Sequence, residues 1–335
     1  MNLLVSDPTN IRYLTGFVSA EPHAREAFVL ITPKQTYLFT NSLYLEQAKT
    51  LGFPVVAISR DNPISQAVVP LVRGPLHFEE SDLTVAEYNQ FKNISLIPTR
   101  NKIEARRMIK KKHEIASIRL AAKLTDQCFS HIKSLIKPRV TEAQLAWEIE
   151  SFICTKGAAL AFSPIVAFGN STSQPHYQGV ALKTLSEQDI VLFDFGARVN
   201  GYCADMTRVI FIGPPKEDWV AAYNAVLSAN KKALEALAKG ERSGAKLDAV
   251  ARETITKAGF TPYSHSLGHA VGLDIHEAPR LTIKKDETLK PGMVFSIEPA
   301  VYIEGKFGIR IEDLVLLTKD GPEILSKSPK DLNLT

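Results

Sequence analysis

The chain has 335 residues, of which 45% are hydrophobic and 23% charged, with a formal net charge of +4 at pH 7. This length favours two domains and leaves ample chain for a hydrophobic core. The composition is that of an ordinary globular protein, and the weak, diffuse positive charge argues against a nucleic-acid-binding function.

Short apolar runs alternate with turn clusters from residue 10 to about residue 100, a pattern typical of a small α/β domain. Strands are expected at 28–31, 36–39 and 54–58, and short helices at 44–51, 63–72 and 84–91. No cluster of catalytic residues falls in this segment. We therefore assign residues 1–101 to a first domain without a catalytic site of its own.

One long helix is expected over residues 102–137, because isoleucine and leucine recur at helical spacing and Pro138 would stop it. The basic run at 106–112 is expected to form the solvated face of this helix. Thr141 then begins a Thr-Glu-Ala-Gln capping box, which predicts the start of a second helix. Strands are expected from residue 163 to about residue 209.

This order of elements then repeats. Helices are expected at 217–238 and 246–258, and strands from 261 to 317. Two successive helix-helix-strands units indicate a duplicated domain of pseudo-twofold arrangement over residues 102–335. If both halves supply functional side chains, the site lies between them.

A hairpin is predicted around Asn200 and Gly201, because Asn-Gly between β-rich runs is a strong turn signal. With these two as the turn residues, Asp194 lies opposite Thr207. Asp205 then lies diagonally from Asp194 on the same face, within about 7–8 Å. Taken alone, this pair of aspartates is as compatible with a polar hairpin surface as with a metal site.

Further chemistry-bearing residues follow in Gly-bracketed or strand-like segments. His265, His269 and His276 fall within twelve residues among glycines, and Glu298 ends an apolar run. Alternation along 308–313 places Arg310 and Glu312 on one strand face, opposite the isoleucines. Inward charges on an apolar strand need partners, because an unpaired buried charge is costly.

Four carboxylates and one imidazole therefore form a candidate metal centre: Asp194, Asp205, His269, Glu298 and Glu312. Four clustered anions repel one another unless cations lie among them. Two divalent ions would balance their charge, and an oxygen-rich set with one nitrogen suits paired hydrolytic metals such as Mn²⁺, with Co²⁺ or Zn²⁺ as alternatives.

At these residues the chain resembles the pita-bread metallopeptidases, which include methionine aminopeptidase, aminopeptidase P, prolidase and creatinase. The matching motifs are Asp194-Phe-Gly, Asp205-Met-Thr-Arg208, Gly268-His269-Ala-Val-Gly272, His276-Glu277-Ala-Pro, Ile297-Glu298-Pro299 and Arg310-Ile-Glu312-Asp313. The opening Asn10-Ile-Arg-Tyr-Leu-Thr-Gly16 is similar to the start of the creatinase/prolidase N-terminal domain. The resemblance implies an N-terminal creatinase-like α/β domain and a pita-bread catalytic domain.

The resemblance also implies roles at the metal centre. Asp194 would chelate one metal, Asp205 and Glu312 would bridge both, and His269 and Glu298 would bind the second. A hydroxide that bridges the metals would be the nucleophile, with Glu298 as proton shuttle.

Four further residues of the pocket resemble family positions that contact the substrate. His176 matches a histidine at the developing oxyanion, and His265 and His276 match two further pocket histidines. Arg280 lies where prolidases have an arginine that grips a substrate carboxylate, and Arg310 would support the ligands. For His265 and Arg280 a purely structural role is the alternative.

The expected activity is that of an Xaa-Pro dipeptidase, most like a prokaryotic prolidase, which cleaves the bond before a C-terminal proline. The alternatives are an Xaa-Pro aminopeptidase that acts on longer peptides and a non-catalytic peptide-binding module on the same fold. Ala270 and Ala300 stand where the family commonly has glycine. These two departures are expected to affect the width of the pocket, and they remove no ligand of the metal centre.

Three scattered cysteines without a C-x-x-C pair, Cys128, Cys154 and Cys203, predict reduced structural thiols. Cys203 is expected to face away from the site, although it lies two residues before Asp205. The first 13 residues lack a signal-peptide pattern, and no stretch reaches membrane-spanning length. We therefore expect a cytoplasmic protein with a small peptide as partner and no membrane or nucleic acid. The resemblance implies a homodimer.

Overall fold

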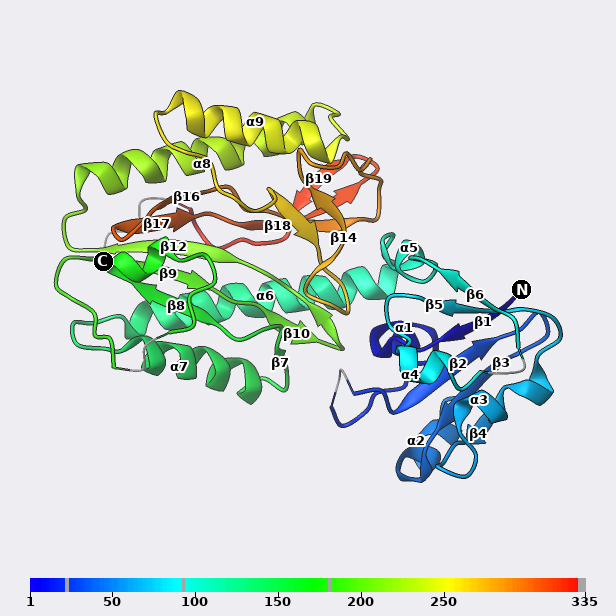
Figure 1. Ribbon diagram of the computed structural model, residues 1–335. Coiled ribbons are helices and arrows are strands. Elements are labelled where there is room, and N and C mark those ends of the chain that lie inside the picture. The colour runs from blue at the N-terminus through cyan, green and yellow to red at the C-terminus, as the bar shows by residue number, and fades with distance from the viewer. Residues whose placement is uncertain (22–23, 92–93, 180–181, 331–335) are drawn as a thin grey trace. The chain divides into compact units, whose positions relative to one another are not determined.

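The computed structural model describes residues 1–21, 24–91, 94–179 and 182–330. The chain divides into two compact units, Met1–Arg107 and Met108–Thr335 (Figure 1). The division follows Arg107, whereas the sequence placed it after residue 101. The predicted α/β class is confirmed, and each unit is described below by itself.

The first unit is built on a six-stranded mixed sheet with strand order β4-β3-β2-β1-β5-β6. Its strands are β1 (Asn2–Val5), β2 (Ala27–Ile31), β3 (Thr36–Thr40), β4 (Val55–Ala57), β5 (Leu76–Glu79) and β6 (Leu96–Thr99). Its helices are α1 (Pro8–Thr15), α2 (Leu45–Lys49), α3 (Ile64–Ala67), α4 (Val85–Tyr88) and α5 (Glu104–Arg107), with short 3-10 turns at Ser42–Tyr44 and Val69–Leu71. Three of these strands and the regions of α2, α3 and α4 were predicted from the sequence.

Strands β1, β5 and β6 were not predicted, and two of the helices differ from the prediction. The helix expected at 63–72 is split, because Pro70 has no N–H to continue the helical ladder. Helix α1 was not predicted, although Asp7 caps it by accepting from the Asn10 N–H at 2.7 Å and Gly16 ends it at φ 80°.

The prediction of a single helix over 102–137 is wrong. The chain forms α5, then an irregular segment, then α6 (Lys112–Leu135), and Lys111 is extended with ψ at 165°. The basic run is not uniformly solvated either, because Arg107 and Lys110 are only 6% and 5% exposed. The Lys110 ammonium lies 3.0 Å from Glu277, and the backbone N–H of Lys110 donates to the Gly292 carbonyl. This buried attachment competes with the helix at Met108–Lys111.

The second unit contains two successive helix-helix-strand sets. The first consists of α6, α7 (Glu142–Thr155), β7 (Ala159–Leu160), β8 (Ile165–Phe168), a 3-10 turn (Gly169–Ser173), β9 (Asp189–Asp194), β10 (Ala197–Val199), β11 (Tyr202–Cys203) and β12 (Thr207–Ile212). The second consists of α8 (Glu217–Ala238), α9 (Gly244–Lys257), β13 (Gly268–Ala270), β14 (Glu277–Leu281), β15 (Val294–Ile297), β16 (Ala300–Ile303), β17 (Phe307–Arg310), β18 (Asp313–Thr318) and β19 (Gly321–Ile324).

These sets form a layered arrangement, with α8 and α9 on one side of the strands and α6 and α7 on the other (Figure 1). A three-stranded sheet has the order β12-β9-β8, and a five-stranded sheet has the order β14-β13-β15-β18-β19. A further antiparallel sheet joins β11, β10 and β7, and β16 pairs with β17. The predicted repetition of two helices followed by strands is thus present.

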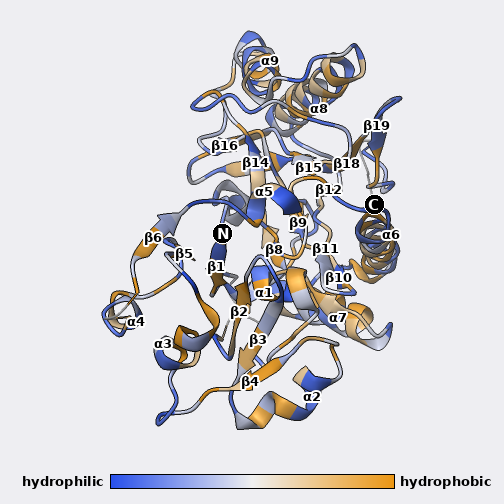
Figure 2. Cartoon of the chain, turned by 90° about the vertical axis from the view of Figure 1, so that its right-hand side faces the viewer, coloured by the Kyte–Doolittle hydropathy of each residue, from blue (hydrophilic) through white to orange (hydrophobic). Residues whose placement is uncertain are grey.

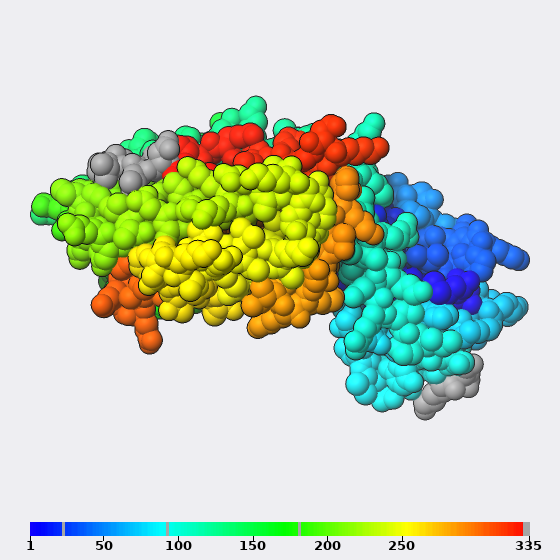
Figure 3. Space-filling view, turned by 90° about the horizontal axis from the view of Figure 1, so that it is seen from above, coloured from blue at the N-terminus to red at the C-terminus, as the bar shows by residue number. Residues whose placement is uncertain are grey.

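Each helix pair packs its apolar stripe on the strands beside it. On α8 the buried residues recur at helical spacing, and Trp219 and Tyr223 contact Phe211 of β12 with ring centroids 6.0 and 5.5 Å away. On α6, Phe129 meets Phe193 of β9 at 6.1 Å. Figure 2 shows hydrophobic and hydrophilic residues alternating around α8 and α9, and Figure 3 shows these two helices side by side on one face of the unit. The strands that carry the site are therefore held between two apolar layers.

No helix within the described ranges is long and apolar enough to cross a lipid bilayer.

Candidate metal centre

The first two carboxylates are placed by the predicted hairpin. Asn200 and Gly201, at φ 52° and 89°, form the two-residue turn between β10 and β11. The register places Asp194 opposite Thr207, as expected. A Cβ on Gly196 would lie 1.8 Å from the Ala204 carbonyl oxygen, so only glycine allows the two chains to approach this closely beside Asp205.

The imidazole comes from a second glycine-dependent contact. His269 lies in β13, directly after Gly268, whose added Cβ would meet the Ser296 carbonyl at 1.9 Å. The His269 N–H donates to Ser296 Oγ at 3.0 Å, and Ser296 Oγ donates to Glu298 Oε1 at 3.1 Å. Through Ser296 the backbone fixes His269 and Glu298 relative to each other, with His269 Nε2 lying 3.4 Å from Glu298 Oε1.

Arg310 and Glu312 were expected on one continuous strand. The structure places them at the junction of two strands, with both side chains in contact with Thr207. Arg310 ends β17, which pairs with β16, and Glu312 lies just before β18 of the five-stranded sheet. Thr207 joins them, because its Oγ1 donates to Glu312 Oε2 at 2.8 Å and accepts from Arg310 Nε at 2.9 Å. Arg310 also forms an ion pair with Asp194.

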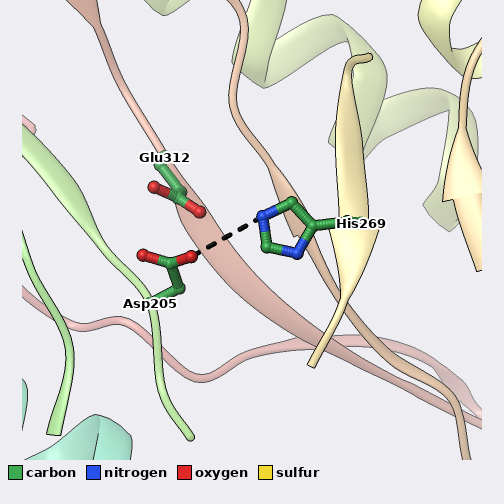
Figure 4. Close-up of side chains that lie close together, drawn as sticks. All are labelled: Asp205, His269 and Glu312. Atoms are coloured by element: carbon green, nitrogen blue, oxygen red, sulfur yellow. Dashed lines mark ion pairs between the residues drawn. The ribbon is translucent and has the colours of Figure 1, made fainter. Parts of the chain in front are cut away.

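The structure brings ligand atoms of Asp205, His269 and Glu312 within 4.8 Å of one another, and all three residues are buried (Figure 4). His269 Nε2 lies 3.6 Å from Asp205 Oδ2. Glu298 flanks this group through its contact with His269, and Asp194 lies on the Arg310 side. The set predicted from sequence is thus one cluster, with three members closest together.

Three carboxylate oxygens of this cluster are buried and have no hydrogen-bond partner among the described residues: Asp194 Oδ1, Asp205 Oδ1 and Glu312 Oε1. A buried polar atom without a partner is costly and needs an explanation. Converging oxygen atoms without hydrogen-bond donors are the ligands that divalent cations require. These carboxylates and the neighbouring imidazole therefore fit metal ions.

The electrostatics lead to the same conclusion. Burial and then the neighbouring charge of Glu312 raise the pKa of Asp205 well above its ordinary value, and burial and Glu298 do the same for Glu312. Burial raises the pKa of Glu298 to about 8. Burial lowers the pKa of His269 to about 3, so its imidazole is neutral and available as a ligand. Burial and mutual repulsion thus disfavour the ionised form of these carboxyl groups, and cations bound among them would favour it.

The cluster opens into a cavity of about 560 Å³. All five candidate ligands line it, together with His176, His265, His276, Arg280 and Arg310. His176, His276 and Arg280 are exposed, whereas His265 is half-buried. The ring centroids of His269 and His276 are 4.4 Å apart, so His276 adjoins the cluster of candidate metal ligands. Apolar side chains of Phe162, Ile165 and Ile275 also line the cavity.

The two alanines at family glycine positions are buried, Ala270 in β13 and Ala300 in β16, and neither belongs to the described lining of the cavity. Cys203 is also outside that lining. Its buried thiol donates to the Leu273 carbonyl at 3.8 Å, and burial raises its pKa to about 12.

Sequence reasoning missed two side chains that organise the centre. Thr207 connects Arg310 with Glu312, and its position opposite Asp194 was a usable signal. Tyr302 accepts from Arg310 Nη1 at 2.6 Å and lies 3.4 Å from His265 Nε2. It comes from β16, and nothing local in the sequence marks it.

Comparison with known proteins gives two family matches, Metallopeptidase family M24 over residues 116–319 and Creatinase/Prolidase N-terminal domain over residues 2–109. The uncharacterized peptidase YqhT of Bacillus subtilis is 34% identical, over 98% of this chain and 94% of the relative. The Xaa-Pro dipeptidase from Bacillus anthracis has a TM-score of 0.91 at 36% identity, covering 100% of this chain and 95% of that one. The X-Pro aminopeptidase from Thermotoga maritima has a TM-score of 0.88 at 31% identity, covering 100% and 97%.

Proposed function

This chain belongs to metallopeptidase family M24, and on that premise we propose that it hydrolyses the peptide bond before proline, with Xaa-Pro dipeptides as its substrates. The observation that carries the proposal is the cluster of Asp205, His269 and Glu312 at the base of a cavity lined with histidines. One buried oxygen of each carboxylate, Asp205 Oδ1 and Glu312 Oε1, has no hydrogen-bond donor among the described residues. The similarity to an Xaa-Pro dipeptidase over the whole chain supports the choice of substrate.

We propose two divalent ions as cofactors, held by Asp194, Asp205, His269, Glu298 and Glu312. Mn²⁺ suits this oxygen-rich set, and Co²⁺ and Zn²⁺ are the alternatives. When bound, such ions act as Lewis acids that polarise a carbonyl and lower the pKa of water.

Glu298 is the residue that we propose moves the proton. Cleavage converts the proline amide nitrogen into an amine, which must gain a proton. Glu298 lies 3.4 Å from His269 Nε2 and lines the cavity that would hold the peptide. A carboxylate within reach of both the ligand set and the peptide would accept a proton from water and return it to the leaving nitrogen.

The other pocket residues bind and orient the peptide. His176 supplies a hydrogen bond to the carbonyl oxygen and the developing negative charge, and His265 and His276 contact the peptide. Arg280, exposed at the cavity, would pair with the carboxylate of a C-terminal proline. Phe162, Ile165 and Ile275 offer an apolar surface for the proline ring. Arg310 holds Asp194 and, through Thr207, orients Glu312.

The test is hydrolysis of Xaa-Pro against Xaa-Pro-Yaa peptides by metal-stripped enzyme reloaded with Mn²⁺, Co²⁺ or Zn²⁺. The proposal expects metal-dependent cleavage with a preference for the dipeptide. Preference for the tripeptide would favour the second candidate, an Xaa-Pro aminopeptidase, which the similarity to the Thermotoga maritima enzyme supports. Peptide binding without cleavage under any metal would favour a non-catalytic module.

We further propose that the second unit carries the catalysis and that the enzyme is a cytoplasmic homodimer. All three cysteines are free, which agrees with a reducing compartment. Light scattering should give twice the 37.0 kDa mass of one chain. A monomer at micromolar concentration would contradict the dimer.

A further inference from the structure

A buried carboxylate behind the cavity wall connects two segments that reach the substrate pocket. Asp248 lies on α9 and is fully buried. Its Oδ1 accepts from Arg252 Nε and from the Tyr263 hydroxyl, both at 2.8 Å. Its Oδ2 accepts from the Ile283 N–H at 2.9 Å, two residues beyond the end of β14, the strand that carries Arg280. Both oxygens of this carboxylate thus bind residues next to segments that line the cavity, Tyr263 near His265 and Ile283 near Arg280.

Arg252 extends this contact to His265. Its Nη1 donates to the Tyr263 carbonyl at 2.7 Å, and its Nη2 donates to the His265 carbonyl at 2.6 Å. The guanidinium carbon lies 4.3 Å from the centroid of the Tyr263 ring, which stacks on the His265 imidazole at 4.8 Å and 26°. One arginine therefore fixes the backbone of His265 and, through Tyr263, the plane of its ring.

The cavity side of His265 is fixed as well. Its Nδ1 donates to the Ser266 carbonyl at 2.7 Å, which leaves Nε2 as the acceptor of the neutral ring. Nε2 lies 3.4 Å from the Tyr302 hydroxyl, and that hydroxyl accepts from Arg310. His265 is therefore held between the α9 network and Tyr302, which contacts Arg310 beside the candidate metal ligands. The tautomer with its hydrogen on Nδ1 is favoured.

We propose that Asp248, Arg252 and Tyr263 are positioning residues for substrate binding: they hold the backbone and ring plane of His265, and so maintain the hydrogen bond from Nδ1 to the Ser266 carbonyl that selects its tautomer. The inference rests on the proposed function, in which His265 contacts the peptide. A second i,i+4 ion pair on α9, between Glu253 and Lys257, is exposed and lies away from this network. It provides an internal control for the ordinary effect of such a pair on the helix.

The principal variant is Arg252→Lys, which keeps the positive charge but loses the planar fork that reaches two carbonyls. The Arg252 side chain is 20% exposed, so this change is compatible with folding. We expect kcat/KM for an Xaa-Pro dipeptide to fall roughly tenfold to hundredfold, as for other misplaced catalytic groups. Metal content should stay at the wild-type level. Tyr263→Phe, which keeps the stacked ring, should lower kcat/KM less than Arg252→Lys does. Glu253→Gln should keep kcat/KM within about twofold of the wild-type value.

A double-mutant cycle separates positioning from a general structural role. In a His265→Ala background, Arg252→Lys should cause no further loss, because the residue through which it acts is gone. Losses that multiply in the double variant would overturn the proposal. So would an equal loss in Glu253→Gln.

Nitrogen-15 NMR of the histidine side chains gives a readout that does not depend on the substrate. We expect wild-type His265 to carry its hydrogen on Nδ1 and Arg252→Lys to shift or mix the tautomers. An unchanged His265 spectrum would overturn the positioning role. If the wild-type enzyme cleaves no proline peptide, the proposed function fails while this spectrum still decides the positioning role.

Discussion

Arg208→Met removes a buried guanidinium that ties together the strands around the metal centre. Arg208 is 1% exposed, and its Nη2 lies 2.9 Å from Asp313 Oδ1. It donates to the carbonyl oxygens of Thr207, at 3.0 Å, and of Glu312, and its Nε and Nη2 donate to the Ser328 carbonyl at 3.1 and 2.9 Å. Methionine fills similar space but supplies none of these donors.

The expected loss follows from what remains after the change. Removal of one partner from a buried ion pair typically costs about 3–5 kcal/mol. Asp313 keeps the Lys330 ammonium as a partner, which places the loss near the lower end. For a unit the size of Met108–Thr335 each kcal/mol lowers Tm by about 2–4 °C, so we expect a fall of about 6–12 °C.

Differential scanning calorimetry of the metal-free protein measures this fall, and Arg119→Met is the matched control. Arg119 pairs with Glu323, but the two side chains are 49% and 39% exposed, so its loss should cost at most about 1 kcal/mol. If Arg208→Met lowers Tm no more than Arg119→Met, the buried network does not stabilise the unit as we argue.

Three further predictions concern the centre and its pocket. Asp205→Asn should abolish metal loading, measured by elemental analysis, together with hydrolysis; full activity in this variant would refute the two-ion site. Arg280→Ala should lower dipeptide cleavage about tenfold, the loss expected for an exposed charged hydrogen bond, and spare a tripeptide. Equal losses on both peptides would show that Arg280 does not bind the terminal carboxylate. Gly196→Ala should lower Tm strongly in circular dichroism, because its Cβ would lie 1.8 Å from the Ala204 carbonyl oxygen, and an unchanged Tm would contradict that clash.

The parts of the site that follow from local rules were predictable from the sequence. A two-residue Asn-Gly turn fixes the register, and the register alone places Asp194 opposite Thr207. Alternation placed Arg310 and Glu312 on one face, although the chain passes there from β17 toward β18. The resemblance to a family then supplied the roles that geometry at the sequence level left open.

The parts that depend on distant contacts were not predictable. No proline or glycine interrupts residues 103–137, yet the helix breaks because Lys110 is attached to Glu277 and Gly292. The contact of Tyr302 with His265 and the network from α9 involve residues far apart in the chain, without a periodic pattern. Helix α1 is a different case, since its Asp7, Pro8 and Gly16 signals were present and went unused.

The most direct test of the central claim is the rate of Xaa-Pro dipeptide hydrolysis, recorded while Mn²⁺ is added to the metal-free enzyme. The account predicts no activity without metal and a rate that reaches its maximum as two ions bind each chain. Full activity in the metal-free enzyme, or maximal activity with a single bound ion, would contradict it.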